Sequence, residues 1–329
     1  MTLPRPRLMC LVGCATALLA FSQVAWAQTY PARPIRLLVP FAPGGAFDTI
    51  ARPWADKMRT VLGTVVIENQ GGGGGSLGAA AVAHARPDGY TILLGGSTIH
   101  LTELLPKNRP LYDPLKDLEP ISMMAVYAMA IAVHPSVPVH TLKELIDYAK
   151  ANSGKLSYGS AGVGTMNHLT GELLKSLTAI PDLPHIPYRG SGPALIDAVS
   201  GQLPIVVPAI TGQVLELYRS GKLRLLAVTN PTRLVAAPDI PTVAEAGFPS
   251  LTTQQIIGLF APTGTPRPVI VQISEATHLA MTDHEYRQLL IEQGFEPPLN
   301  WTPEKFQRII ADDSARWMPV VRMLGVKLD

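Results

Sequence analysis

The sequence predicts a two-domain α/β protein with mainly parallel sheets flanked by helices, in which two crossing strands join the domains. Apolar runs typical of strands alternate with helical segments along most of the 329 residues, which is the pattern of parallel sheets with both faces covered. A chain of this length can bury two substantial cores. Two long, nearly uncharged runs, 121–133 and 255–261, have the composition expected of strands that pass from one domain to the other.

The first 27 residues have the features of a secretory signal peptide. Arg5 and Arg7 precede an apolar run from 8 to 21, and Ala25-Trp26-Ala27 forms an A-x-A end. This predicts export to the periplasm with cleavage after Ala27. A retained membrane anchor is an alternative, although the run is short for a bilayer. A lipoprotein box ending at Cys14 is another, although the segment stays apolar well beyond that cysteine.

Composition argues against several classes of function. The chain has 27 basic and 25 acidic residues and no basic stripe, so the electrostatic footprint of a nucleic-acid binder is missing. Both cysteines, Cys10 and Cys14, fall inside the predicted signal peptide. The mature chain is therefore expected to form neither a disulfide nor a thiolate metal site. We expect no metal and no cofactor.

The order of the segments predicts that one domain is inserted into the other. Domain I is expected to comprise 28–125 and 255–329, and domain II to comprise 126–254. In domain I, strands are expected at 30–40, 65–68 and 91–98, with a helix from Thr49, a second at 79–83, and three C-terminal helices from 269 onward. In domain II, strands at 156–160, 185–188, 203–207 and 223–229 alternate with helices, one of which is expected at 194–200. Gly/Ser-rich loops follow several of these strands.

One loop in domain I has the features of an anion site. The segment Phe41–Asp48, F-A-P-G-G-A-F-D, separates the first expected strand from the first expected helix. A Gly-Gly turn before a helix leaves backbone N–H groups unpaired, and these donors together with the helix dipole favour an anion. Asp48 is either a first-turn acid favoured by the dipole or a residue that orders the loop or accepts a ligand hydrogen bond.

The other loops expected at the cleft carry small residues and one arginine. Ser97 and Thr98 end the third strand, where ligands bind in such sheets. Arg189 stands between small residues in a loop of domain II. It either clamps a carboxylate in bidentate fashion or forms a surface or interdomain ion pair.

Catalytic and metal motifs are incomplete in this sequence. Neither glycine-rich loop is followed by a P-loop lysine. The run Gly71–Gly75 is either a flexible turn into a helix or a bare backbone that approaches a ligand. His168 and Glu172 share a helix face, but nothing in the sequence completes a metal site, so His168 is expected to cap a helix or line the cleft. No serine has a G-x-S-x-G context, so we expect no enzyme; the alternative is a secreted serine hydrolase using Ser160 and His168.

A set of motifs in fixed order is similar to one family. The mature chain resembles the substrate-binding proteins of tripartite tricarboxylate transporters, also called Bug proteins. The resemblance is carried by Y-P-A-R-P-I-R-L-L-V-P-F-A-P-G-G-A-F-D-T-I-A-R at 30–52, P-D-G-Y-T-I-L-L-G at 87–95, L-S-Y-G-S-A-G-V-G-T-M-N-H-L at 156–169, I-P-Y-R-G-S-G-P-A-L-I-D at 186–197, L-A-V-T at 226–229, I-P-T-V-A-E-A-G-F-P at 240–249 and L-F-A-P-T-G-T-P at 259–266.

The resemblance implies a periplasmic-binding-protein-like "Venus flytrap" without catalysis. Such a protein, expected here as a monomer, binds a small organic carboxylate between its domains and presents it to the membrane permease subunits of its transporter. A sensory role with a membrane receptor is the alternative. Together, the loops and the resemblance predict these ligand-binding residues: Ala42, Pro43, Gly44, Gly45, Asp48, Ser97, Thr98, Ser160, Gly162, Gly164, Thr165, His168, Tyr188, Arg189, Gly190 and Ser191.

The sequence departs from this family's pattern at three places. Gln70-Gly71-Gly72 stands where Arg-Pro-Gly is usual, which predicts a looser loop, and Ile256 stands where a tryptophan is common. Pro204 and Pro208 stand where aspartates are frequent. Without those carboxylates an amino-acid ligand is less favoured, because its ammonium group would lack a partner.

Overall fold

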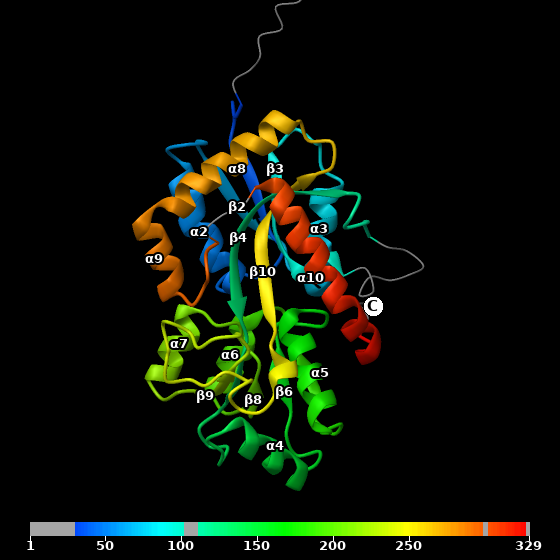
Figure 1. The fold of residues 1–329 in the computed structure, drawn as a ribbon, viewed down its shortest axis with the longest axis vertical. Coiled ribbons are helices and arrows are strands. Elements are labelled where there is room, and N and C mark those ends of the chain that lie inside the picture. Colours follow the sequence, from blue (N-terminus) through cyan, green and yellow to red (C-terminus); the bar gives the residue numbers. More distant parts are fainter. Residues whose placement is uncertain (1–29, 102–110, 299–301, 327–329) are drawn as a thin grey trace, which may run out of the picture. The chain divides into compact units, whose positions relative to one another are not determined.

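The computed structural model describes residues 30–101, 111–298 and 302–326 (Figure 1). The predicted signal peptide lies outside these residues. Every element described below belongs to one compact unit, Arg33–Asp329. In the described ranges, no helix has both the length and the apolar character needed to cross a membrane.

Two five-stranded sheets organise this unit. The first has the order β2-β1-β3-β10-β4, and the second has the order β7-β6-β8-β5-β9. The first sheet consists of β1 (Ile35–Val39), β2 (Val65–Asn69), β3 (Thr91–Gly96), β4 (Leu118–Ala128) and β10 (Gln254–Pro262). The second consists of β5 (Ala130–Val133), β6 (Tyr158–Ser160), β7 (His185–Pro187), β8 (Ile205–Val206) and β9 (Arg224–Val228).

Both sheets are mixed, so the expectation of mainly parallel sheets is wrong in this detail. β1 pairs in parallel with β2 and β3, whereas β10 pairs antiparallel with β3 and β4. In the second sheet, β6 is parallel to β7 and β8, and β5 is antiparallel to β8 and β9. The antiparallel pairs arise because β4 leaves the first sheet for the second and β10 returns.

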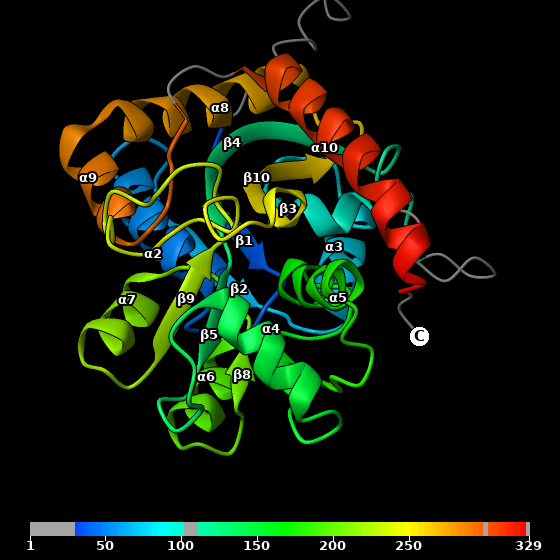
Figure 2. The same ribbon diagram turned by 60° about the horizontal axis from the view of Figure 1, so that its bottom comes forward.

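Helices cover both sheets. They are α2 (Ala46–Met58), α3 (Ser76–Ala83), α4 (Leu142–Ala151), α5 (Met166–Thr178), α6 (Ser191–Val199), α7 (Gly212–Arg219), α8 (Arg267–Thr282), α9 (His284–Glu292) and α10 (Pro303–Leu324), with 3-10 turns η1 (Gly73–Gly75), η2 (Ser97–His100) and η4 (Pro249–Leu251). Around the first sheet, α2, α8 and α9 lie on one side and α3 and α10 on the other (Figure 2). In α2, Ile50, Trp54 and Met58 recur at helical spacing and are fully buried, which fixes the face that packs inward.

The crossing between the sheets takes place at Met129. The single strand expected at 121–133 is broken there, with β4 ending one residue before it and β5 starting one residue after it. Thr229 links this crossing to the returning one: its hydroxyl accepts from Met129 N–H at 2.9 Å and lies 2.6 Å from the Thr253 carbonyl. The predicted boundary at 125/126 falls inside β4, and the division into domains I and II remains our prediction.

Two helices begin three residues earlier than the sequence indicated. α2 starts at Ala46 rather than Thr49, and α6 starts at Ser191 rather than Ala194. The N-cap residues are therefore Gly45 and Gly190. This shift places the predicted anion loop, and the loop that carries Arg189, directly at helix N-termini.

Candidate functional site

The starts of three helices surround a small cavity, which we call the inner cavity. α2, α5 and α6 follow the ends of the parallel strands β1, β6 and β7, so their N-termini lie where ligands bind in α/β sheets. The cavity is lined by Phe41, Ala42, Gly45, Ala46, Phe47, Thr98, Tyr127, Ala161, Thr165, Met166, Asn167, Gly190, Ser191, Ala209 and Gln255.

The N-terminus of α2 presents free backbone donors. Gly45 has extended backbone angles, φ −87° and ψ 177°, and no described side chain caps it. The first helical hydrogen bond runs from Thr49 N–H to Gly45 O at 3.0 Å. The N–H groups of Ala46 and Phe47, both cavity-lining residues, therefore have no acceptor within the helix.

The N-terminus of α6 faces the same cavity from the second sheet. Gly190 has φ 129° and ψ 168°, and no described side chain caps this helix either. The φ value lies in the region that favours glycine. The N–H groups of Ser191 and Gly192 occupy the first turn, while Pro193 has no N–H to offer.

The N-terminus of α5 completes the arrangement. Thr165 caps it by accepting the His168 N–H at 3.3 Å. The N–H groups of Met166 and Asn167 precede the first helical hydrogen bond and remain available. Three helix dipoles thus direct partial positive charge at one small volume, an arrangement that favours an anion.

Asp48 orders the loop at the start of α2 rather than lining the inner cavity. Its buried carboxylate accepts from Gly44 N–H at 3.0 Å, from Arg52 at 2.8 and 3.0 Å, and from Asn69 Nδ2 at 3.2 Å. Burial alone would raise the pKa of Asp48, but these hydrogen bonds outweigh burial and hold that pKa below its usual value. Of the roles left open by the sequence, the structure supports the ordering role.

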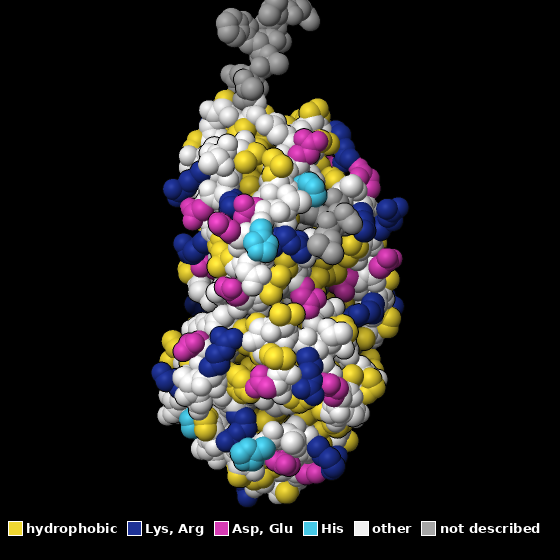
Figure 3. All heavy atoms as spheres, turned by 60° about the vertical axis from the view of Figure 1, so that its left-hand side comes forward, with side chains coloured by type: hydrophobic (Ala, Val, Ile, Leu, Met, Phe, Trp, Pro, Cys, Tyr) yellow, Lys and Arg dark blue, Asp and Glu magenta, His cyan; other side chains and the backbone are white. Residues whose placement is uncertain are grey.

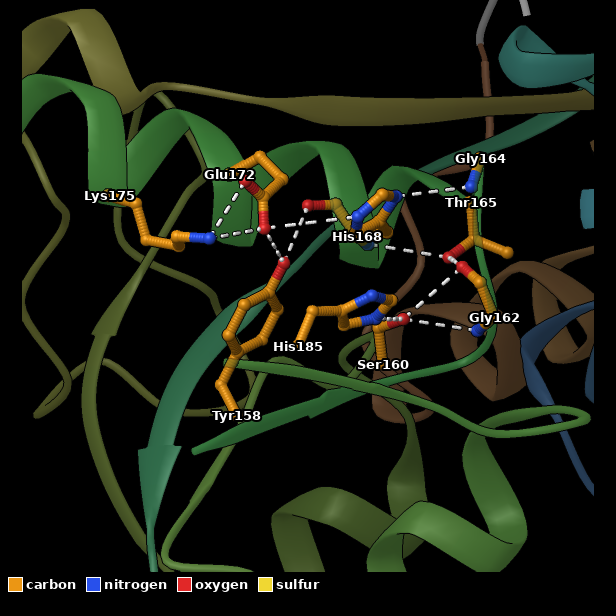
Figure 4. A network of polar contacts seen from close by, with 9 residues as sticks. All are labelled: Tyr158, Ser160, Gly162, Gly164, Thr165, His168, Glu172, Lys175 and His185. Carbon is orange, nitrogen blue, oxygen red and sulfur yellow. Dashed lines mark hydrogen bonds and ion pairs between the residues drawn. The ribbon is translucent and has the colours of Figure 1, made fainter. Parts of the chain in front are cut away.

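The side chains of three further predicted residues form hydrogen bonds that fix the backbone of the loop 161–165 (Figure 4). The Ser160 hydroxyl accepts from Gly162 N–H at 3.1 Å and lies 2.7 Å from His185 Nε2. The Thr165 hydroxyl donates to Gly162 O at 2.7 Å. His168 Nδ1 accepts from Gly164 N–H at 3.2 Å. These side chains shape the loop that lines the cavity.

The geometry argues against the Ser160/His168 hydrolase. The histidine beside Ser160 is His185, which is 25 residues away in the sequence, and His168 Nδ1 is engaged by the loop backbone. Ser160 is 1% exposed and does not line the inner cavity. A substrate bound there would therefore not meet its hydroxyl.

A stacked histidine pair forms the centre of the network behind this loop. The rings of His168 and His185 lie 4.0 Å apart with 21° between their planes. Glu172 accepts from Tyr158 OH at 2.7 Å and from Lys175 at 3.0 Å, and lies 3.9 Å from His168 Nε2. Burial lowers the pKa of each histidine to about 4. In the described part of the chain, no group of three or more metal-binding side chains occurs.

This pair predicts a pH-dependent stability. His168 stays neutral in the folded protein down to its pKa of about 4, whereas in the unfolded chain it protonates below its ordinary value of 6.5. Stability should therefore fall as the pH is lowered from 6.5 toward 4. His168→Asn keeps an acceptor for the Gly164 N–H but does not titrate. In urea unfolding, its stability loss between pH 7 and pH 5 should be smaller than that of the wild type by about 1–2 kcal/mol. Equal losses in the two proteins would contradict this assignment.

The predicted site residues divide into three groups. Ala42, Gly45, Thr98, Thr165, Gly190 and Ser191 line the inner cavity. Ala42, Gly162, Tyr188 and Arg189 line an adjoining, larger cleft, the outer cleft. Pro43, Gly44, Asp48, Ser97, Ser160, Gly164 and His168 line neither. Ser97 is buried, and its hydroxyl accepts from Ile256 N–H at 3.0 Å, so it fixes β10 rather than reaching into the cavity.

Three polar lining residues were not predicted individually. Tyr127 and Gln255 are register partners on the crossing strands β4 and β10, and they place a hydroxyl and an amide in the wall of the cavity. Burial raises the pKa of Tyr127, so its hydroxyl stays protonated. Asn167 donates from Nδ2 to Val207 O at 2.8 Å. The feature of the sequence that could have identified Gln255 and Tyr127 as lining residues is their polarity within otherwise apolar runs.

On the face shown in Figure 3, basic and acidic side chains are interspersed, and no region of one sign stands out. The formal net charge of the whole sequence is +2.

The fold and the cavity define a two-domain solute receptor of the periplasmic-binding-protein type. The chain belongs to the family described as "Tripartite tricarboxylate transporter family receptor", whose sequence model matches residues 50–326. Members of this family are periplasmic solute-binding receptors and not enzymes. The predicted family and fold class are therefore confirmed.

Individual relatives match over nearly their whole length. Protein BugT of Bordetella pertussis is 35% identical over 326 residues, which covers 98% of each chain. MatC from Rhodopseudomonas palustris, solved with bound malate, has a TM-score of 0.84 and 32% identity over 89% of this chain and 100% of its own. R. palustris Rpa4515, solved with adipate, has a TM-score of 0.86 and 32% identity over 91% of this chain and 100% of its own.

Proposed function

We propose that this protein captures a small organic carboxylate between its two domains and delivers it to the membrane permease subunits of a tripartite tricarboxylate-type transporter. The observation that carries this proposal is the convergence of the α2, α5 and α6 N-termini on the inner cavity. The malate and adipate held by two similar proteins support the same ligand class.

Backbone donors can supply the required affinity. Each hydrogen bond to a charged group contributes about 1.5–3 kcal/mol, and micromolar binding needs about 8 kcal/mol. Four or five such bonds, less the cost of ordering the ligand, reach this range. Phe41, Phe47 and Met166 add apolar surface for a carbon skeleton, while Thr98 and Gln255 add polar groups.

The kind of side chains in the wall of the inner cavity determines which class of ligand is favoured. Among the described residues, neither an acidic nor a basic side chain lines the inner cavity. An anion is therefore favoured by dipoles and N–H groups alone, and an ammonium group would find no carboxylate partner. This supports a carboxylic acid over an amino acid, in agreement with the prolines at 204 and 208.

The cellular location, the oligomeric state and the partner of this receptor are also part of the proposal. We infer export with cleavage after Ala27, action as a monomer in the periplasm, and transport rather than partnership with a sensory receptor. A pull-down from membranes with the ligand-loaded protein tests the partner: recovery of permease subunits supports transport, and recovery of a receptor alone supports sensing.

A ligand panel tests the binding function. Thermal unfolding is followed with monocarboxylates, dicarboxylates, tricarboxylates and aromatic carboxylates, with uncharged amides of the same skeletons as controls. At least one acid should raise the Tm in a concentration-dependent manner, because a ligand that binds only the folded state stabilises it. Failure of every acid at millimolar concentration, together with no small acid detected by mass spectrometry of the denatured protein, would refute the proposal.

A further inference from the structure

The outer cleft shares part of its wall with the inner cavity. Phe41, Ala42 and Ala161 line both. The outer cleft is lined by the run Gly71–Gly75, which we call the glycine strap, and also by Val163 and the segment Pro187–Arg189. The two spaces therefore meet at these residues, and the outer one is the larger.

The glycine strap keeps this space open. Gly72 and Gly73 have φ values of 138° and 54°, which favour glycine. A Cβ on Gly72 would lie 2.6 Å from Leu77 Cδ1, and one on Gly73 would lie 2.5 Å from Ser76 Oγ. Side chains are thus disfavoured at these positions, and the strap presents bare peptide groups to the cleft.

Arg189 supplies a positive charge to the outer cleft. Its side chain is exposed, and no described carboxylate forms an ion pair with it, whereas Arg36, Arg52 and Arg233 each pair with an acid. The neighbouring Tyr188 directs its hydroxyl to Asp197 at 2.7 Å, which leaves that acid engaged elsewhere. No acidic residue lines the outer cleft within the described ranges.

We propose that the outer cleft is a second subsite, in which Arg189 binds the distal carboxylate of an elongated diacid whose first carboxylate lies in the inner cavity. This inference depends on the function proposed for that cavity. The guanidinium fork suits a carboxylate because it donates two parallel hydrogen bonds.

Matched pairs of acids test the subsite. Isothermal titration calorimetry compares succinate, adipate and suberate with butyrate, hexanoate and octanoate. The wild type should bind the longer diacids about tenfold more tightly than the monoacids of equal length, because only a diacid reaches Arg189. Arg189→Gln should remove this preference and leave monoacid affinity within about twofold.

Two further variants separate the subsite from general charge and folding effects. Arg86→Gln removes an exposed arginine beyond the C-terminal end of α3, outside both cavities, and should change neither affinity. Gly71 accepts a side chain, because its φ is outside the positive range and its Cβ would have Ala42 N as nearest neighbour at 3.5 Å. Gly71→Leu should therefore weaken the long diacids and spare succinate.

The outcomes distinguish this inference from the function on which it rests. If no carboxylate binds the wild type, the proposed function itself fails. If carboxylates bind but wild-type affinities of diacids and monoacids are equal, or Arg189→Gln weakens both equally, the subsite is refuted while the inner site stands. Long diacids that keep their affinity in Gly71→Leu would likewise refute it.

Discussion

Gly45→Leu is expected to abolish carboxylate binding and to leave the protein folded. Gly45 lines the inner cavity, and a Cβ built on it would have only Ala42 O within 4 Å, at 3.8 Å. The added side chain would therefore enter unfilled space in front of the α2 N–H groups. Loss of two or more charged hydrogen bonds, each worth about 1.5–3 kcal/mol, predicts a Kd at least about 100-fold higher.

The backbone at Gly45 makes this a clean test of the site. Its φ of −87° is accessible to any residue, whereas φ at Gly44 is +83°, so a side chain at Gly44 would strain the loop as well. Calorimetry measures the affinity, and urea unfolding should show a stability change of about 1 kcal/mol or less. Gly45→Ala is the matched control and should bind with a smaller loss. Wild-type affinity in folded Gly45→Leu would mean that the ligand does not occupy the inner cavity.

The sequence predicted the anion loops well because their signals are local. A strand, a glycine turn and a helix in immediate succession define a helix N-terminus without tertiary information, as at Gly45. The start of α6 was predicted three residues late because Gly192 and Pro193 look like loop residues. A first helical turn tolerates proline, since its N–H groups have no helical acceptor, and the structure accordingly includes Ser191-Gly192-Pro193 in α6.

The role of side chains behind the loops was not predictable from local patterns. Ser160 was expected to meet the ligand, yet its partner is His185, which β7 brings alongside β6 from 25 residues away. Gln255 and Tyr127 come together because the crossing strands pair antiparallel. Such contacts depend on strand register, and one residue of slip would turn each side chain to the opposite face.

Ser191→Pro is expected to weaken carboxylate binding about 10- to 100-fold, because it deletes one N–H donor at the start of α6. Ser191 is the first residue of this helix, so its N–H has no acceptor within the helix and proline's fixed φ suits the position. Gly190 before it has ψ 168°, close to the extended range required before proline. α10 already begins with Pro303, so this chain accommodates such a start.

The control for this change separates the backbone donor from the side chain. Ser191→Ala retains the N–H and removes the hydroxyl, and it should bind within about threefold of the wild type. If Ser191→Ala loses as much affinity as Ser191→Pro, the hydroxyl is the donor and the α6 dipole is a minor contribution. If both variants bind as the wild type does, α6 takes no part in holding the anion. Loss of affinity in the proline variant alone would show that the backbone N–H of Ser191, at the start of α6, binds the carboxylate together with the N-terminus of α2.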